Sequence, residues 1–282
     1  MSRYDYTAAL DGTERFIERP DGTKLRTLKA GSGERTVLLA HGYGSAAESW
    51  NIVMAKLVEM GMSVVVFDQR GHGQSTVGSD GVGTNQMASD YAAVLEAYSL
   101  TNAILVGHSM GGFLSLAFLL GNEEAKSRVG ALLLMSTFAG DVSRDNPQNR
   151  LQIPLIKSGV LQKLVTFKPM AKAFTKSLIG DDFEDGMVDA FIPAFLSTDH
   201  AQLVPVLQAM VEENRYGRLG EIDMPCAVVV GSKDKTTPPF HTTDLHAGIR
   251  GSTLRHLPGV GHGPNWEAPD QIVEEIVALG ER

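Results

Sequence analysis

The chain has 282 residues, of which 43% are hydrophobic and 21% charged, a composition typical of a soluble globular protein with one sizeable core. The formal net charge of −8 argues against nucleic acid or an anionic membrane as a partner. No apolar run is long enough to span a bilayer and no secretory signal is evident, so we expect a cytoplasmic protein without stable membrane insertion. Cys226 is the only cysteine, which excludes an internal disulfide.

Short apolar runs alternate with helical patterns through the first half of the chain, which favours a mostly parallel sheet with helices on both faces. The series opens with a hairpin around the Asp21-Gly22 turn. The elements expected here are strands at 15–19, 24–30, 36–40, 63–68, 103–107 and 131–136, and helices at 50–60, 85–98 and 109–120.

The alternation stops between 138 and 222, where the pattern is helical and the prolines at 154, 193 and 205 are expected to divide it into short helices. It then resumes with a strand at 226–232, a helix at 238–246, a strand at 253–257 and a helix at 269–279. The sequence therefore predicts an α/β fold with a mostly parallel, doubly wound sheet. Residues 1–137 and 223–282 would form the core, and 138–222 a helical cap inserted before the penultimate strand.

The sequence "GHSMG", from Gly107 to Gly111, follows an apolar strand and opens an apolar helix. This context is typical of a nucleophile elbow, in which a serine occupies a sharp, strained turn between strand and helix. The helix N-terminus directs backbone N–H groups at the space above the serine, where they suit a developing oxyanion. We therefore predict that Ser109 is a nucleophile.

Ser109 needs a base within hydrogen-bond reach to remove its proton. His108 is its neighbour in the sequence, but adjacent residues of a strand or helix point in different directions, so we expect His108 to pack beside the sheet. His262 follows the last predicted strand, between Gly261 and Gly263. This loop lies at the carboxyl edge of the sheet, where doubly wound folds bind their ligands. We predict that His262 is the base.

A third group should accept the other imidazole N–H and stabilise the imidazolium. Asp234 follows the penultimate predicted strand and precedes His262, which gives the chain order serine, aspartate, histidine expected of a nucleophile-elbow fold. Asp141 is the first carboxylate after the preceding strand, and Asp68 ends another strand, where we expect it to pair with Arg70 or to cap its loop. We predict that Asp234 is the acid.

The segments "HGYG", "DQRGHGQS", "GHSMGG", "GSKDKTTPP" and "GVGHGPNWEAP" together resemble the α/β-hydrolase family, from about residue 15 to the end of the chain. The resemblance agrees with His262 as the base. It implies an oxyanion hole made by the backbone N–H groups of Tyr43 and Met110, with Gly44 as the alternative to Tyr43. It also implies that Glu267 contacts nearby backbone and that 138–222 covers the site.

Most relatives with this triad act on esters, so the resemblance implies a carboxylic-ester hydrolase that works through an acyl-enzyme. The apolar cap indicates a small-molecule substrate with an apolar acyl or aromatic group, and we expect Phe138 and Trp266 to lie at its pocket. No zinc-type spacing and no dinucleotide motif is evident, so we expect neither a metal nor a cofactor. Hydrolysis of a carbon–carbon bond, a thioester or a lactone, cofactor-free perhydrolysis, and a ligand receptor remain alternatives. The oligomeric state stays open.

Overall fold

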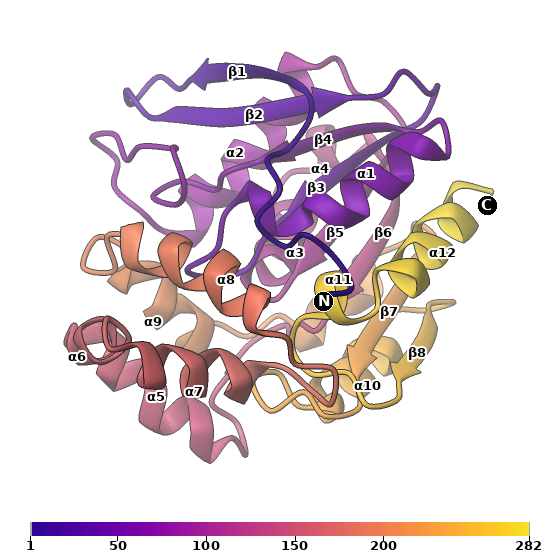
Figure 1. Ribbon diagram of the computed structural model, residues 1–282. Coiled ribbons are helices and arrows are strands. Elements are labelled where there is room, and N and C mark those ends of the chain that lie inside the picture. Colours follow the sequence, from indigo (N-terminus) through magenta and orange to yellow (C-terminus); the bar gives the residue numbers. More distant parts are fainter. Residues whose placement is uncertain (1, 282) are drawn as a thin grey trace.

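The computed structural model describes residues 2–281, apart from the side chains of 124 and 125. Eight strands within it form one sheet in the order β1-β2-β4-β3-β5-β6-β7-β8 (Figure 1). β1 pairs with β2 and β2 with β4 antiparallel, and every other pair is parallel. The strands are β1 (Thr13–Glu18), β2 (Lys24–Ala30), β3 (Thr36–Ala40), β4 (Ser63–Phe67), β5 (Ala103–His108), β6 (Val129–Met135), β7 (Cys226–Gly231) and β8 (Thr253–Leu257).

Helices cover both faces of the sheet because its central strands are apolar on both sides. Along β3, Val37 and Leu39 pack under α1 and α12, while Leu38 and Ala40 join the core under α2, α3 and α10. The helices of this layered core are α1 (Asn51–Glu59), α2 (Thr84–Ala97), α3 (Met110–Gly121), α4 (Glu123–Lys126), α10 (Pro239–Gly248), α11 (Pro264–Glu267) and α12 (Pro269–Gly280), with the 3₁₀ segment η1 (Ala47–Trp50). The predicted α/β fold is confirmed.

A helical insertion lies between β6 and β7, before the penultimate strand as predicted. It packs around a small apolar core of its own, to which Phe195 contributes the largest fully buried side chain. Figure 1 shows these helices as a separate layer beside the sheet. They are α5 (Pro147–Lys157), α6 (Val160–Leu164), α7 (Lys168–Leu178), α8 (Asp185–Ser197) and α9 (Val204–Glu212), followed by the 3₁₀ segment η2 (Tyr216–Glu221).

Two of the three prolines expected to break this region do not break it. Pro154 lies inside α5 and Pro193 inside α8, whereas Pro205 lies in the first turn of α9. A proline within a helix removes one backbone hydrogen bond. Both interior prolines are on exposed faces, where water can bind the carbonyl that each leaves without a partner.

The residues before β1 pack across the junction between cap and core, a contact that the sequence pattern did not indicate. The ring of Tyr6 is buried and meets Trp266 edge-on with 6.0 Å between the ring centroids, and Met187 of α8 joins the same cluster. Within the described part of the chain, no helix is both long and apolar enough to cross a membrane.

Candidate active site

Ser109 lies at the sharp turn between β5 and α3. Its φ of 53° places a non-glycine residue in the left-handed region, a strained conformation that the surrounding packing must maintain. The glycine two residues later permits that packing, because a Cβ on Gly111 would lie 2.4 Å from the carbonyl oxygen of Ala40. The close approach of α3 to β3 thus fixes the serine at the carboxyl edge of the sheet.

His262 lies in the loop after β8 and is directed at this serine. Its Nε2 is 3.1 Å from the Oγ of Ser109, and its Nδ1 is 3.0 Å from Oδ2 and 3.1 Å from Oδ1 of Asp234. With the proton on Nδ1, the imidazole donates to the carboxylate and accepts from the serine hydroxyl. The structure therefore brings together the three residues predicted to form the triad.

Asp234 is buried in the loop after β7, where several groups donate hydrogen bonds to its carboxylate. The backbone N–H groups of Thr236 and Thr237 donate to Oδ1 at 2.9 and 2.8 Å, and the Thr237 hydroxyl donates to Oδ2 at 2.8 Å. Burial would raise the pKa of Asp234, but the charge of His262 and these hydrogen bonds outweigh it and hold the pKa below its ordinary 3.8. The carboxylate is therefore charged throughout the neutral pH range.

The two carboxylates considered as alternatives lie elsewhere. Asp68 caps its own loop by accepting from the backbone N–H groups of Ala47 and Gln74, each at 2.8 Å, and its cationic neighbour is Arg26 at 3.3 Å rather than Arg70. Asp141 accepts a hydrogen bond from a backbone N–H within its own turn. Neither is hydrogen-bonded to a histidine.

His108 positions the backbone of His262. Its Nε2 donates to the carbonyl oxygen of His262 at 2.7 Å, and the two rings lie 4.9 Å apart between centroids. Burial, reinforced by the charge of His262, lowers the pKa of His108 to about 3, so this imidazole stays neutral. The hydrogen bond is more specific than the packing role that the sequence predicted.

Glu267 holds both sides of the His262 loop. Its buried carboxylate accepts hydrogen bonds from the backbone N–H groups of Gly261 at 2.9 Å and Gly263 at 3.1 Å. It accepts a third from the backbone N–H of Gly180, just after the cap helix α7, at 2.7 Å. Burial raises the pKa of Glu267, and the three N–H groups oppose that rise. The carboxylate contacts backbone as expected, and it also ties the cap to the loop of the base.

Replacing Glu267 with glutamine should destabilise the fold by about 3 kcal/mol, because an amide NH₂ would face backbone N–H donors that it cannot pair with. Urea unfolding at neutral pH measures this loss. Glu274→Gln is the matched control: its exposed carboxylate pairs with Arg255 at 3.1 Å on the surface, so its effect should stay within about 0.5 kcal/mol. Equal stabilities of the two variants would contradict this role for Glu267.

The loop after β3 lies against the elbow, where the second oxyanion donor is predicted. A Cβ on Gly42 would lie 3.2 Å from the Cβ of Ser109, which shows how closely this loop approaches the serine. The next residue, Tyr43, lines the cavity, and its hydroxyl donates to Nδ1 of the cap residue His200 at 2.7 Å. Met110 is the first residue of α3, so its N–H has no intrahelical carbonyl to bind. The oxyanion role of these two amides remains a proposal.

A cavity of about 130 Å³ lies between cap and core and contains Ser109 and His262 on its wall. Trp266 lines it, as expected. Phe138 does not: it is fully buried and stacks on Phe113, with 5.2 Å between the ring centroids, so its position just after β6 places it in the core. Most of the surface lining the cavity is apolar, with Ile153, Ile156, Phe174, Leu178, Ile179, Phe191, Phe195, Leu207 and Met210 contributed by or beside the cap helices.

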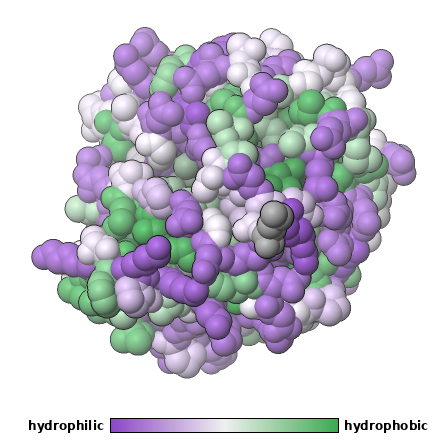
Figure 2. All heavy atoms as spheres, in the orientation of Figure 1, coloured by the Kyte–Doolittle hydropathy of each residue, from purple (hydrophilic) through white to green (hydrophobic). Residues whose placement is uncertain are grey.

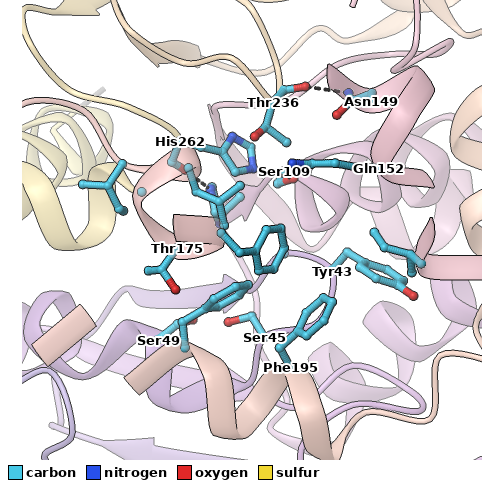
Figure 3. Close-up of a pocket in the computed structure, with 18 of the residues that line it drawn as sticks. Tyr43, Ser45, Ser49, Ser109, Asn149, Gln152, Thr175, Phe195, Thr236 and His262 are labelled. Atoms are coloured by element: carbon cyan, nitrogen blue, oxygen red, sulfur yellow. Dashed lines mark hydrogen bonds between the residues drawn. The ribbon is translucent and has the colours of Figure 1, made fainter. Parts of the chain in front are cut away.

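The polar side chains that line the cavity are hydroxyls, amides, the imidazoles of His108 and His262, and the indole of Trp266. No Asp, Glu, Lys or Arg is among the described residues on its wall, and no cluster of metal-ligating side chains occurs in the described part of the chain. In Figure 3 the side chain of Gln152, on α5, extends toward Ser109 and His262, while Asn149 of the same helix donates to the carbonyl oxygen of Thr236 at 2.8 Å. The sequence pattern did not indicate this position for Gln152, because a glutamine in a helical pattern usually marks an exposed face.

Comparisons with known proteins agree with this architecture. A model described as "Alpha/beta hydrolase family" matches residues 37–275. Two hydrolases of 2-hydroxy-6-oxononadienedioate and 2-hydroxy-6-oxononatrienedioate are similar over most of their length. The one from Klebsiella pneumoniae is 30% identical over 279 residues, and the one from Paraburkholderia xenovorans 29% over 278, with 94% of each chain covered.

Solved structures with different activities share the fold. The esterase EaEST from Exiguobacterium antarcticum superposes with a TM-score of 0.82 at 24% identity, covering 96% of this chain and all of that one. The enol-lactonase from Burkholderia xenovorans gives a TM-score of 0.79 at 19% identity, covering 95% of this chain and all of that one. At these identities the likeness establishes the fold alone.

Proposed function

Because this chain belongs to the alpha/beta hydrolase family, we propose that it is a serine hydrolase cleaving small, uncharged carboxylic esters with apolar acyl groups. The observation that carries the proposal is the contact between Ser109 and His262 on the wall of a cavity whose described residues include no Asp, Glu, Lys or Arg. The contact supports the reaction class, and the cavity supports the substrate class.

In the proposed reaction, Ser109 attacks the acyl carbonyl carbon while His262 Nε2 takes its proton, and Asp234 stabilises the resulting imidazolium. The oxygen that becomes negative accepts hydrogen bonds from the N–H groups of Tyr43 and Met110. His262 then protonates the departing alkoxide, and the acyl group remains bonded to Ser109. Water, deprotonated by the same imidazole, attacks the acyl-enzyme and releases the acid.

The size of the cavity limits the acyl group. Its volume of about 130 Å³ resembles the roughly 150 Å³ cavity that holds a benzene molecule and falls below the 300–1,000 Å³ common for larger ligands. A short aliphatic or a phenyl acyl group fits such a space. A carboxylate on the acyl group would enter the cavity without a cationic partner, at a cost of several kcal/mol.

Cleavage of a carbon–carbon bond is the second candidate, favoured by the relatives of about 30% identity that are named as dienedioate hydrolases. Ser109, with His262 as its base, could attack the ketone carbonyl of such a compound. Its two carboxylates, however, have no counterpart among the side chains of the cavity. Because no Lys or Arg is among the described residues of the cavity wall, the ester is favoured over the dienedioate.

A matched pair of substrates tests the proposal. p-Nitrophenyl butyrate and p-nitrophenyl hemisuccinate differ by a carboxylate in place of the terminal methyl group. We expect kcat/KM to be about 100-fold higher for the butyrate, because the cavity leaves the carboxylate unpaired. Comparable values for the two esters would overturn the neutral-substrate proposal. Cleavage of the dienedioate without turnover of either ester would replace it with carbon–carbon hydrolysis.

A further inference from the structure

The cap concentrates positive charge in a chain whose net charge is −8. Between 146 and 180 the sequence contains one arginine and five lysines and no aspartate or glutamate. All six of these cationic residues are exposed. The segment from Lys157 to Met170, which covers α6 and the start of α7, holds three of them and is named here the cap patch.

Large apolar side chains are exposed among the lysines of the cap patch. Phe167 is 64% exposed, and Val160, Leu164 and Met170 are each about 40% exposed. Figure 2 shows hydrophobic and hydrophilic residues intermingled at the lower left of the molecule, where α6 lies in Figure 1. Leu161 and Val165 of the same segment, with Ala171 directly after it, already fill the cap core, so packing within the chain does not account for the exposed set.

The lysines of the cap patch are free to meet an external anion. Within the described residues, no ion pair joins Lys157, Lys163 or Lys168 to a carboxylate, whereas Lys172 pairs with Asp185 at 2.6 Å. The acidic residues that follow α7 are also engaged: Asp181 pairs with Lys233, and Asp182 pairs with Arg3.

We propose that the cap patch docks this protein reversibly on an anionic lipid bilayer. Lysines flanking exposed aromatic and aliphatic side chains are the combination that binds the headgroup region, where the ammonium groups meet lipid phosphates and the apolar groups enter the acyl boundary. The acidic remainder of the molecule does not prevent this, because charges more than about 8 Å from the contact are screened at physiological salt. The net charge of the whole chain therefore did not indicate this surface.

Two other occupants fit less well. A second copy placed patch to patch would bring lysines against lysines, which costs free energy. Nucleic acid would satisfy the cations but leave the four apolar side chains without a matching surface. The inner faces of α5 and α7 line the cavity, so docking places the cap between the bilayer and Ser109.

Vesicle co-sedimentation of the full chain tests the proposal. The Ser109→Ala variant is used throughout, so that a failure to dock is separate from any failure of the hydrolytic function. We expect binding to vesicles of phosphatidylcholine with phosphatidylglycerol, little binding to phosphatidylcholine alone, and release at high salt. Equal binding to both vesicle types, or none to either, would overturn it.

Paired variants locate the surface. Adding Lys163→Gln and Lys168→Gln should weaken binding to the anionic vesicles about 20-fold, and Phe167→Ser should weaken it further. Lys24→Gln with Lys29→Gln, on β2, which lies away from α6 and α7 in Figure 1, removes the same charge and should leave binding within about twofold. Equal losses for the two double variants would overturn the assignment to the cap. Two further results would overturn the proposal if the protein did not bind vesicles. One is dimerisation, measured by light scattering, that the patch variants abolish. The other is oligonucleotide binding that the same variants abolish.

Discussion

Ser109→Ala should lower kcat for p-nitrophenyl butyrate by about 10⁵-fold or more while the protein stays folded. The substitution removes the Oγ that lies 3.1 Å from His262 Nε2 and leaves no other nucleophile in that position. The fold should tolerate it, because alanine keeps the Cβ and the chain around the strained turn is unchanged. Steady-state kinetics with circular dichroism measure both quantities.

Ser115→Ala is the control for this experiment. Ser115, which lies within α3, is buried as Ser109 is, but its Oγ donates to the carbonyl of Gly111 at 2.7 Å and it does not line the cavity. Its loss should change kcat by less than tenfold and reduce stability by about 1 kcal/mol. If Ser109→Ala retained a rate close to that of this control, Ser109 would not be the nucleophile.

Asp234→Asn should lower kcat by about 10³- to 10⁴-fold with KM nearly unchanged. An asparagine directs an NH₂ at the ring, so His262 would carry its proton on Nε2 and could no longer accept from Ser109. Asp270 is an exposed aspartate of α12 that pairs with Lys56 at 2.8 Å, and Asp270→Asn should change kcat by less than twofold. A similar kcat for both variants would contradict the role of Asp234.

The lowered pKa of Asp234 also has a consequence for stability. A carboxyl whose folded-state pKa lies below its unfolded value stabilises the fold above that unfolded value, near 3.8, and this contribution is lost as the pH falls through the folded-state pKa. The wild type should therefore lose stability more steeply than Asp234→Asn below about pH 4. Urea unfolding between pH 3 and pH 7 follows the difference.

Sequence reasoning could predict the sheet and the meeting of the three triad residues because both depend on local signals. A buried apolar run bounded by turn residues specifies a strand, and in a parallel sheet the loops after such strands gather at one edge. Ser109 and Asp234 each follow a strand of this kind, and His262 follows the parallel edge strand β8, which is only partly buried. Their side chains therefore had to lie near one another, although 153 residues separate the first from the last.

The cap and the supporting contacts could not be predicted in the same way. Packing against the core decides which face of α5 turns inward. The position of Gln152 at the cavity could therefore not be predicted from the sequence pattern. Phe138 follows a strand, as the triad residues do, but its ring fits beside Phe113 in the core. The bond from His108 to the His262 carbonyl and the contact of Tyr6 with Trp266 join distant segments, and no local pattern encodes them.

Trapping the acyl-enzyme tests the central claim most directly. The wild type is mixed with p-nitrophenyl butyrate, quenched in acid within the first turnovers, digested and analysed by mass spectrometry. We predict a butyryl group on the peptide that contains Ser109 in the wild type, and its accumulation in Asp234→Asn, where deacylation is slowed. Turnover with no acylated peptide in either protein, or a butyryl group that persists in Ser109→Ala on another residue, would contradict the account.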